Sequence, residues 1–200
     1  MKKLLLTATL SLFSLTAVAE NITLPNPDLT GGKPLMTVLS ERRSTRAFSE
    51  KELDKQTLSE LLWATWGISS SDGKRTVPTA LNKQNMDLYV VSKTGIYLYN
   101  ASQNLLEQTS DKDVRSIVAS AQEFALKAPI HLVYVGTQKE PWSAMHAGSM
   151  YQNAGLYCAS VGLNNVVRGS FDKENLTKAL NLSDDKAPLI VQAIGYPPEK

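Results

Sequence analysis

The chain has 200 residues, of which 42% are hydrophobic, so we expect one buried core and not a disordered chain. Its formal charge of +2 comes from Lys2 and Lys3, because the rest of the sequence holds 19 basic and 19 acidic residues, and this balance argues against a nucleic-acid-binding protein. The single cysteine, Cys158, allows no intrachain disulfide, and with only two histidines no structural zinc site is expected.

The first 19 residues have the layout of a cleavable secretory signal. Met1-Lys2-Lys3 precedes an apolar stretch from Leu4 to Val18, and small residues stand at Ala17 and Ala19 before Glu20. The stretch is shorter than the roughly 20 mostly apolar residues that span a bilayer. We therefore expect cleavage after Ala19, a periplasmic or secreted protein, and no stable membrane anchor. A buried N-terminal helix is the alternative.

Residues 20–33 contain two prolines and two glycines and predict an extended arm, which is followed by one domain over residues 34–200. A short helix is expected over residues 34–41, with Pro34 near its first turn. Thr57-Leu58-Ser59-Glu60 is a capping box in front of an apolar run, so it predicts the start of a second helix. Gly67 can end that helix in the left-handed conformation.

The rest of the chain mixes helices and strands without a regular βαβ repeat, which indicates an α+β fold. A hairpin is predicted over Met86–Val91 and Gly95–Tyr99, and an almost continuously apolar strand over Ile130–Val135, covered on both faces. The helices expected here run from about Lys112 to Lys127, from Ser143 to Val161 with Gly162 at the end, and from an Asp172 cap through Leu180. A last strand is expected over Pro188–Gly195.

Three segments carry residues suited to binding a ligand. In an extended Glu41–Phe48 segment, Arg42, Ser44 and Arg46 would project to one side, and two guanidinium groups with a hydroxyl suit a phosphate. The Lys74–Gln84 loop offers hydroxyls and amides for the edge of a heterocycle, stiffened by a proline. The Gly162–Phe171 segment ends in Arg-Gly, where glycine lets a ligand approach the backbone. A solvated basic turn, a polar connection and a simple β-turn are the respective alternatives.

The other candidate side chains give no catalytic motif. Cys158 lies in an apolar stretch and is expected to be buried and unreactive. His131 is expected to be a core histidine with its hydrogen bonds satisfied, whereas His146 could lie at the surface or in a site. Neither has a serine and aspartate at triad spacing. The three tryptophans are expected to add bulk to the core or an interface.

These segments, in this order, resemble the FMN-dependent nitroreductase family, and particularly its branch of azoline-oxidising dehydrogenases that act on peptides. The stretches that carry the resemblance extend over nearly the whole mature chain: Glu41–Phe48, Trp63–Ile68, Gly73–Gln84 with Tyr89–Val91, Gly95–Tyr99, Gln152–Gly169 and Ile194–Pro197. Arg-Arg-Ser-x-Arg combined with the Gln-Asn helix and Val-Arg-Gly is the specific part of this pattern.

The resemblance implies a nitroreductase-like α+β fold, with a mostly antiparallel sheet flanked by helices, in an intertwined homodimer that binds FMN at its interface. Residues of one subunit would hold the phosphate, the ribityl chain and part of the ring edge: Arg42, Arg43, Ser44 and Arg46. The other subunit would supply Pro78, Thr79, Ala80 and Asn82. The backbone around Val167, Arg168 and Gly169 would lie near the flavin N5, and no metal is expected.

The function that this resemblance implies is that of an exported FMN-dependent oxidoreductase. It would carry out ping-pong hydride transfer through the flavin N5 on a small or peptide-derived substrate, and no side chain would need to act as acid or base. The main alternative is a non-catalytic flavin-binding carrier or sensor. A protein with an empty pocket, used only for interactions, is a third interpretation.

Overall fold

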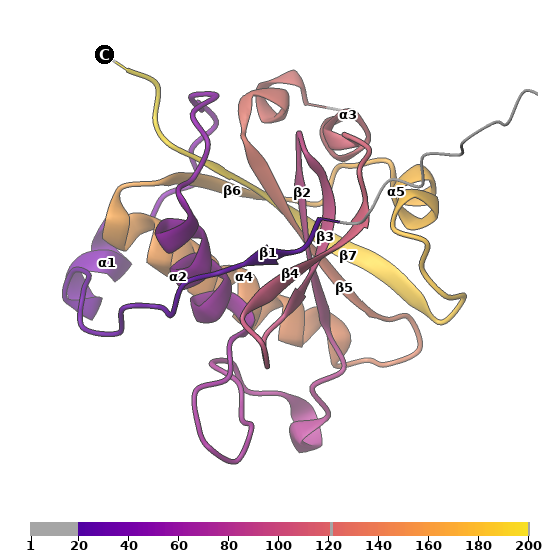
Figure 1. Ribbon diagram of the computed structural model, residues 1–200, viewed down its shortest axis with the longest axis horizontal. Helices are drawn as coiled ribbons and strands as arrows, with labels where there is room; N and C mark the ends of the chain where they lie inside the picture. Colours follow the sequence, from indigo (N-terminus) through magenta and orange to yellow (C-terminus); the bar gives the residue numbers. More distant parts are fainter. Residues whose placement is uncertain (1–19, 121, 200) are drawn as a thin grey trace, which may run out of the picture.

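The computed structural model describes residues 20–120 and 122–199, so the predicted signal segment 1–19 lies outside the described residues. The strands form one seven-stranded sheet in the order β1-β4-β3-β2-β5-β7-β6, and all neighbours are antiparallel (Figure 1). Their bounds are β1 Ile22–Thr23, β2 Asp87–Ser92, β3 Gly95–Asn100, β4 Leu105–Ser110, β5 Ile130–Thr137, β6 Asn164–Arg168 and β7 Lys186–Gly195. The predicted α+β fold is confirmed.

Helices cover both faces of the sheet. One face packs against the two longest helices, α2 and α4, and the other against α3, α5 and the 3-10 helix η2. β5 lies inside the sheet between β2 and β7 and is buried at seven of its eight residues, as its apolar sequence predicts. The helix bounds are α1 Leu35–Glu41, α2 Lys55–Trp66, α3 Arg115–Ala119, α4 Ser143–Val161, α5 Lys173–Ala179, η1 Ala80–Asn82 and η2 Glu123–Lys127. No helix in the described ranges is both long and apolar enough to cross a bilayer.

Helix α2 begins earlier than its capping box predicts. The N-cap is Asp54, whose carboxylate accepts a hydrogen bond from the Thr57 N–H at 2.9 Å and another from the Thr57 hydroxyl. These bonds hold the pKa of Asp54 below its usual value. Thr57 thus lies in the first turn, because an aspartate three residues earlier satisfies the exposed backbone donor.

Replacing Asp54 with alanine is expected to lower the free energy of unfolding by about 1 kcal/mol, because the helix loses its cap. Asp54→Asn keeps an oxygen acceptor and should lose less than half of that. Urea denaturation at pH 7 of the three proteins measures both differences. Equal losses in the two variants would show that Asp54 stabilises through its charge and not as an acceptor.

The glycines at the two long helix ends differ from each other. Gly162 follows α4 in the left-handed region at φ 78°, as predicted, but Gly67 after α2 has φ −70° and is extended. The prediction of a left-handed stop at Gly67 is therefore wrong. Glycine is needed there for space, because a Cβ would lie 2.5 Å from the Trp63 carbonyl oxygen.

The predicted helix from Lys112 to Lys127 is also wrong, since the region forms the short elements α3 and η2. In a continuous helix the Val118 carbonyl would accept from the N–H of residue 122. Here it accepts from Arg168 Nη1 at 3.1 Å, and the Gln122 N–H bonds to Ala119 instead. A buried arginine from β6 thus ends α3. Strand β4, which precedes this region, was not predicted at all.

His131 on β5 is fully buried, but the expectation that its hydrogen bonds are satisfied is wrong. Neither ring nitrogen has a hydrogen-bond partner among the described residues. Burial, together with the positive charges of Arg168 and Arg115, lowers the pKa of His131 to about 3, against the smaller effects of Asp113 and of the nearby Ala125 backbone. The imidazole is therefore neutral in the folded protein at neutral pH.

Candidate functional site

The segment after α1 lies along the edge of β6, where the sheet ends. The Thr45 N–H donates to the Asn165 carbonyl at 2.8 Å, and the Asn165 N–H donates to the Thr45 hydroxyl at 3.0 Å. The Asn164 side-chain amide donates to the Ala47 carbonyl at 2.7 Å. The Asn165 side chain accepts in turn from buried Gln192. The predicted phosphate-binding segment is therefore extended and fixed to the core of the fold.

Three of the four residues predicted in this segment have side chains available to a ligand. In the described part of the chain, Arg42, Ser44 and Arg46 make no side-chain hydrogen bond or ion pair. The aliphatic stem of Arg42 lies on α4, where a Cβ on Gly155 would be 3.6 Å from Arg42 Cδ. Arg43 differs, because its Nη1 donates to the carbonyls of Ser40 and Arg42 at 2.8 and 2.9 Å.

The end of β6 offers backbone groups to the same edge. Because N–H and C=O directions alternate along a strand, the outward-facing Asn165 places the Val167 backbone on the outer side as well. Gly169 follows directly, is exposed, and has nothing within 4 Å of the position a Cβ would occupy. The Gly169 position therefore borders open space, and the Val167 backbone lies on the same outer edge of the sheet as the arginine segment.

The Arg168 side chain is turned inward and is not available to a ligand. It donates to the Gln122 side chain at 2.6 Å and to the carbonyls of Val118 and Ser170. Burial lowers the pKa of Arg168. The sequence-based prediction for this position involves only its backbone. The buried guanidinium holds the end of β6 in place.

The predicted loop with Pro78, Thr79, Ala80 and Asn82 folds around η1. The Thr79 hydroxyl accepts from the Gln84 N–H, and the Asn82 side chain accepts from the Gln84 amide at 3.1 Å. Leu81, Asn82 and Gln84 all have positive φ, and Leu81 is 89% exposed. The loop is joined to α4 where the Ala80 N–H donates to His146 Nε2 at 2.8 Å.

The structure does not bring the two predicted halves of the site together within one chain. The loop contacts α4 at His146, and the arginine segment contacts it at Gly155. These positions are nine residues apart, which is about 14 Å along a helix axis. In Figure 1 the loop near residue 80, coloured magenta, lies at the lower edge, away from α1. One chain therefore holds two separate half-sites.

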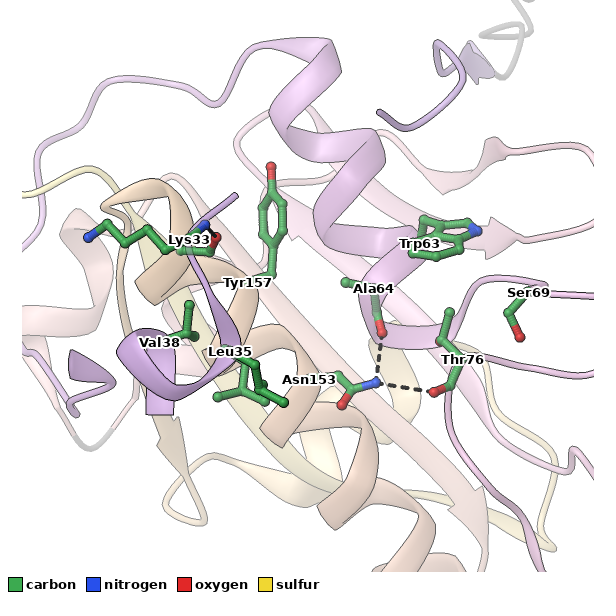
Figure 2. Close-up of a pocket in the computed structure, with 11 residues that line it drawn as sticks. Lys33, Leu35, Val38, Trp63, Ala64, Ser69, Thr76, Asn153 and Tyr157 are labelled. Carbon is green, nitrogen blue, oxygen red and sulfur yellow. Dashed lines mark hydrogen bonds between the residues drawn. The ribbon is translucent and has the colours of Figure 1, made fainter. Parts of the chain in front are cut away.

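A pocket of about 510 Å³ opens between α1, α2 and α4 (Figure 2). Its lining is mostly apolar and comes from Leu35, Val38, Trp63, Ala64, Leu156 and Tyr157, among others. Asn153 forms part of the wall and donates to the Ala64 and Thr76 carbonyls at 3.1 and 3.4 Å. At about 100° per residue, the lining residues of α4 lie on the helix side opposite Gly155, so this pocket is distinct from the arginine segment.

Known proteins match this chain over almost all of the described fold. The sequence profile of the Nitroreductase family matches residues 39–196. The chain belongs to the nitroreductase family. A crystal structure of a "putative nitroreductase" from Ralstonia eutropha JMP134 is 40% identical, with a TM-score of 0.84 over 90% of each chain.

Two further proteins are similar to this nitroreductase-family chain. "Putative nitroreductase MJ1384" of Methanocaldococcus jannaschii is 26% identical over 80% of this chain and 90% of its own length. The E. coli microcin synthetase McbBCD, in complex with truncated pro-MccB17, has a chain of TM-score 0.66 and 21% identity, over 96% of this chain and 79% of that one. The second likeness shows the fold alone.

Sequence reasoning left two of the positioning residues of this nitroreductase chain without a role. His146 is buried on α4 and bonded to the loop, and Asn153, two turns further along the same face, joins α4 to α2 and to the segment before the loop. Their spacing of seven residues, two helical turns, is the signal that could have placed them on one face. Among residues 20–120 and 122–199 no three metal-binding side chains cluster.

Proposed function

We propose that this nitroreductase-family chain is an exported, homodimeric FMN-dependent oxidoreductase. It transfers hydride through the flavin N5 by a ping-pong mechanism on a small or peptide-derived substrate. The observation that carries the proposal is the division of the site into two half-sites. Each half-site carries polar groups and contacts α4, but within one chain the two lie apart.

The arginine half-site fits the phosphate of FMN. A phosphate needs positive charge and several donors, and guanidinium groups present donors in pairs. Arg42 and Arg46 have no other polar partner in the described part of the chain, and Ser44 adds a hydroxyl. Arg42 is held against α4 by its stem, so its charged end needs little further ordering to bind.

The end of β6, beside the arginine segment, fits a flat ring. Gly169 borders open space and the Val167 backbone lies on the outer edge of the sheet, where a planar molecule can approach within hydrogen-bonding distance. When bound there, FMN supplies the hydride-accepting and hydride-donating chemistry. A backbone N–H near the N5 position would orient the ring and favour its reduced form. The chain itself binds, orients and excludes water, and it needs no general acid or base.

A second copy of the chain is the partner that would complete the site. Large apolar side chains are exposed on α1 and at both ends of α4: Leu35, Met36, Leu39, Trp142, Met145 and Val161. Leu35 also lines the apolar pocket of Figure 2. If two copies pack these faces about a two-fold axis, the loop of one copy can lie beside the arginine segment of the other. Apolar burial would drive this association.

Replacing Met36, which is 76% exposed on α1, with aspartate should separate the proposed dimer. A buried unpaired carboxylate costs several kcal/mol, so we expect the dimer dissociation constant to rise at least ~10-fold, with loss of flavin. Leu126→Asp is the matched control, because Leu126 is 44% exposed on η2 at the opposite face of the sheet. Sedimentation velocity of both variants measures the effect. A dimer that survives Met36→Asp contradicts this interface.

Export and substrate class rest on separate observations. Export is supported by the basic start, the apolar stretch and the small residues of positions 1–19. A peptide-derived substrate is supported by the likeness to a chain of McbBCD, a complex with a truncated peptide precursor bound. Membership of the azoline-oxidising branch remains a prediction.

Redox cycling of the purified protein tests the function. We expect FMN absorbance that is bleached by dithionite under argon and restored by a nitroaromatic or quinone acceptor over many turnovers. Bound FMN that is reduced but never reoxidised by any such acceptor would favour the flavin carrier or sensor. A colourless protein that is unchanged by added FMN would contradict both.

A further inference from the structure

The structure assigns a second role to α4: we propose that His146 is a positioning residue, which holds the Thr79–Gln84 loop in its flavin-binding shape only while its imidazole is neutral. This inference rests on the proposed function, because the loop is the half-site that the partner subunit's flavin would contact. Ala80 donates its N–H to His146 Nε2 at 2.8 Å, and both residues belong to the described fold.

The direction of this hydrogen bond fixes the tautomer. A nitrogen that accepts from a backbone N–H carries no proton, so the ring proton is on Nδ1. Nδ1 is buried and has no partner among the described residues. His146 is 4% exposed, so water does not easily replace the missing contact. The ring is thus held in place by its single bond to the loop.

Protonation would break this bond. A second proton on Nε2 faces the Ala80 N–H, and two donors then meet at 2.8 Å. The charged groups that face the ring are Glu140, which favours the protonated form, and Lys83, which opposes it. These two residues are paired with each other at 2.9 Å. Burial has the largest effect and lowers the pKa of His146.

The loop depends on such outside contacts because its own backbone is unfavourable. Leu81, Asn82 and Gln84 all have positive φ, which costs free energy for residues other than glycine. Three side-chain contacts join the loop to residues outside it. Arg75 Nε binds Gln84 at 2.9 Å, Lys83 binds Glu140 before α4, and His146 binds the turn between them. Of these three contacts, the one with His146 is made by an imidazole, which gains a donor when it is protonated.

FMN titrations of wild type, His146→Gln and His146→Phe at pH 8 and pH 5 test the proposal. Glutamine places an oxygen acceptor near the position of Nε2 and does not titrate. We expect its affinity at pH 8 to lie within about threefold of wild type. Between pH 8 and pH 5 the wild type should lose at least ~5-fold more affinity than His146→Gln, because the FMN phosphate titrates equally in both. Phenylalanine should bind weakly at both values.

Hydrogen exchange of the Ala80 amide, measured without flavin, gives a second readout. Its protection should fall between pH 8 and pH 5 in wild type and stay constant in His146→Gln, while circular dichroism shows both proteins folded. If the two proteins lose affinity and protection in parallel, the proposal is overturned. If wild type binds no FMN at pH 8, the proposed function fails instead, and the exchange experiment still decides the role of His146.

Discussion

Replacing Arg42 with alanine is expected to weaken FMN binding by about one to two orders of magnitude, because a charge-assisted hydrogen bond contributes about 1.5–3 kcal/mol. The guanidinium lies at the end of a stem held against Gly155 and has no other partner in the described chain. Little rearrangement can therefore replace it. Isothermal titration of wild type and variant with FMN measures the loss.

Riboflavin, which lacks the phosphate, distinguishes a phosphate contact from a general effect. Arg42→Ala should reduce riboflavin affinity less than threefold. Lys93→Ala is the charge control. Lys93 lies on the exposed turn between β2 and β3, outside the proposed site, and its ammonium is paired with Glu52. Equal losses for FMN and riboflavin, or an unchanged FMN affinity, would show that Arg42 does not bind the phosphate.

We expect the stability of this protein to fall with falling pH at values well above the usual pKa of a carboxylate. The unfolded chain protonates His131 near pH 6.5, but the folded chain does so only near pH 3. Between these values the unfolded state binds more protons, so stability falls as the pH falls. At pH 5 the loss relative to pH 8 is about 2 kcal/mol for this one group.

His131→Leu isolates this effect. Neither imidazole nitrogen has a partner within hydrogen-bonding geometry among the described residues, so leucine removes no such bond, and it keeps a similar volume at a fully buried position. We expect the variant to be at least as stable as wild type at pH 8 and to lose about 2 kcal/mol less on transfer to pH 5. Urea denaturation at both pH values, at one protein concentration, measures this. A wild-type loss that the variant shares fully would assign the acid sensitivity to other groups.

The sequence predicts elements well where periodicity and caps agree. Helix α4 is predicted at both ends, because its small and apolar residues run to a glycine at φ 78°. The hairpin of β2 and β3, the helix after Asp172 and the buried strand β5 are confirmed to within two residues at most ends. In each case the local signal and the tertiary packing favour the same structure.

The remaining elements depend on contacts between residues that are far apart in the sequence, which the local sequence does not predict. The break between α3 and η2 comes from Arg168, which lies about fifty residues further along the chain and takes the Val118 carbonyl. Strand β4 has two leucines, of which only Leu106 is buried, followed by four polar residues, so its pairing with β3 and β1 makes it a strand. The hydrogen bonds of His131 were predicted wrongly because the sequence of a strand does not show which groups of other elements pack against its side chains.

The candidate site divides in the same way. The residue types and order of the arginine segment and of the β6 end are readable from the sequence, and the structure brings these two together. That Arg43 turns to its own backbone, and that His146 holds the loop, depends on side-chain geometry alone. The separation of the loop from the arginine segment along α4 is the structural feature on which the proposal of a second chain rests.

The most direct test of a flavin site shared between two copies is light scattering combined with flavin absorbance across one size-exclusion peak, after saturation with FMN. A peak with twice the mass of one chain and one FMN per chain is the expected result. A peak with the mass of a single chain that retains FMN in the same ratio would contradict the shared site, as would a dimer that binds none.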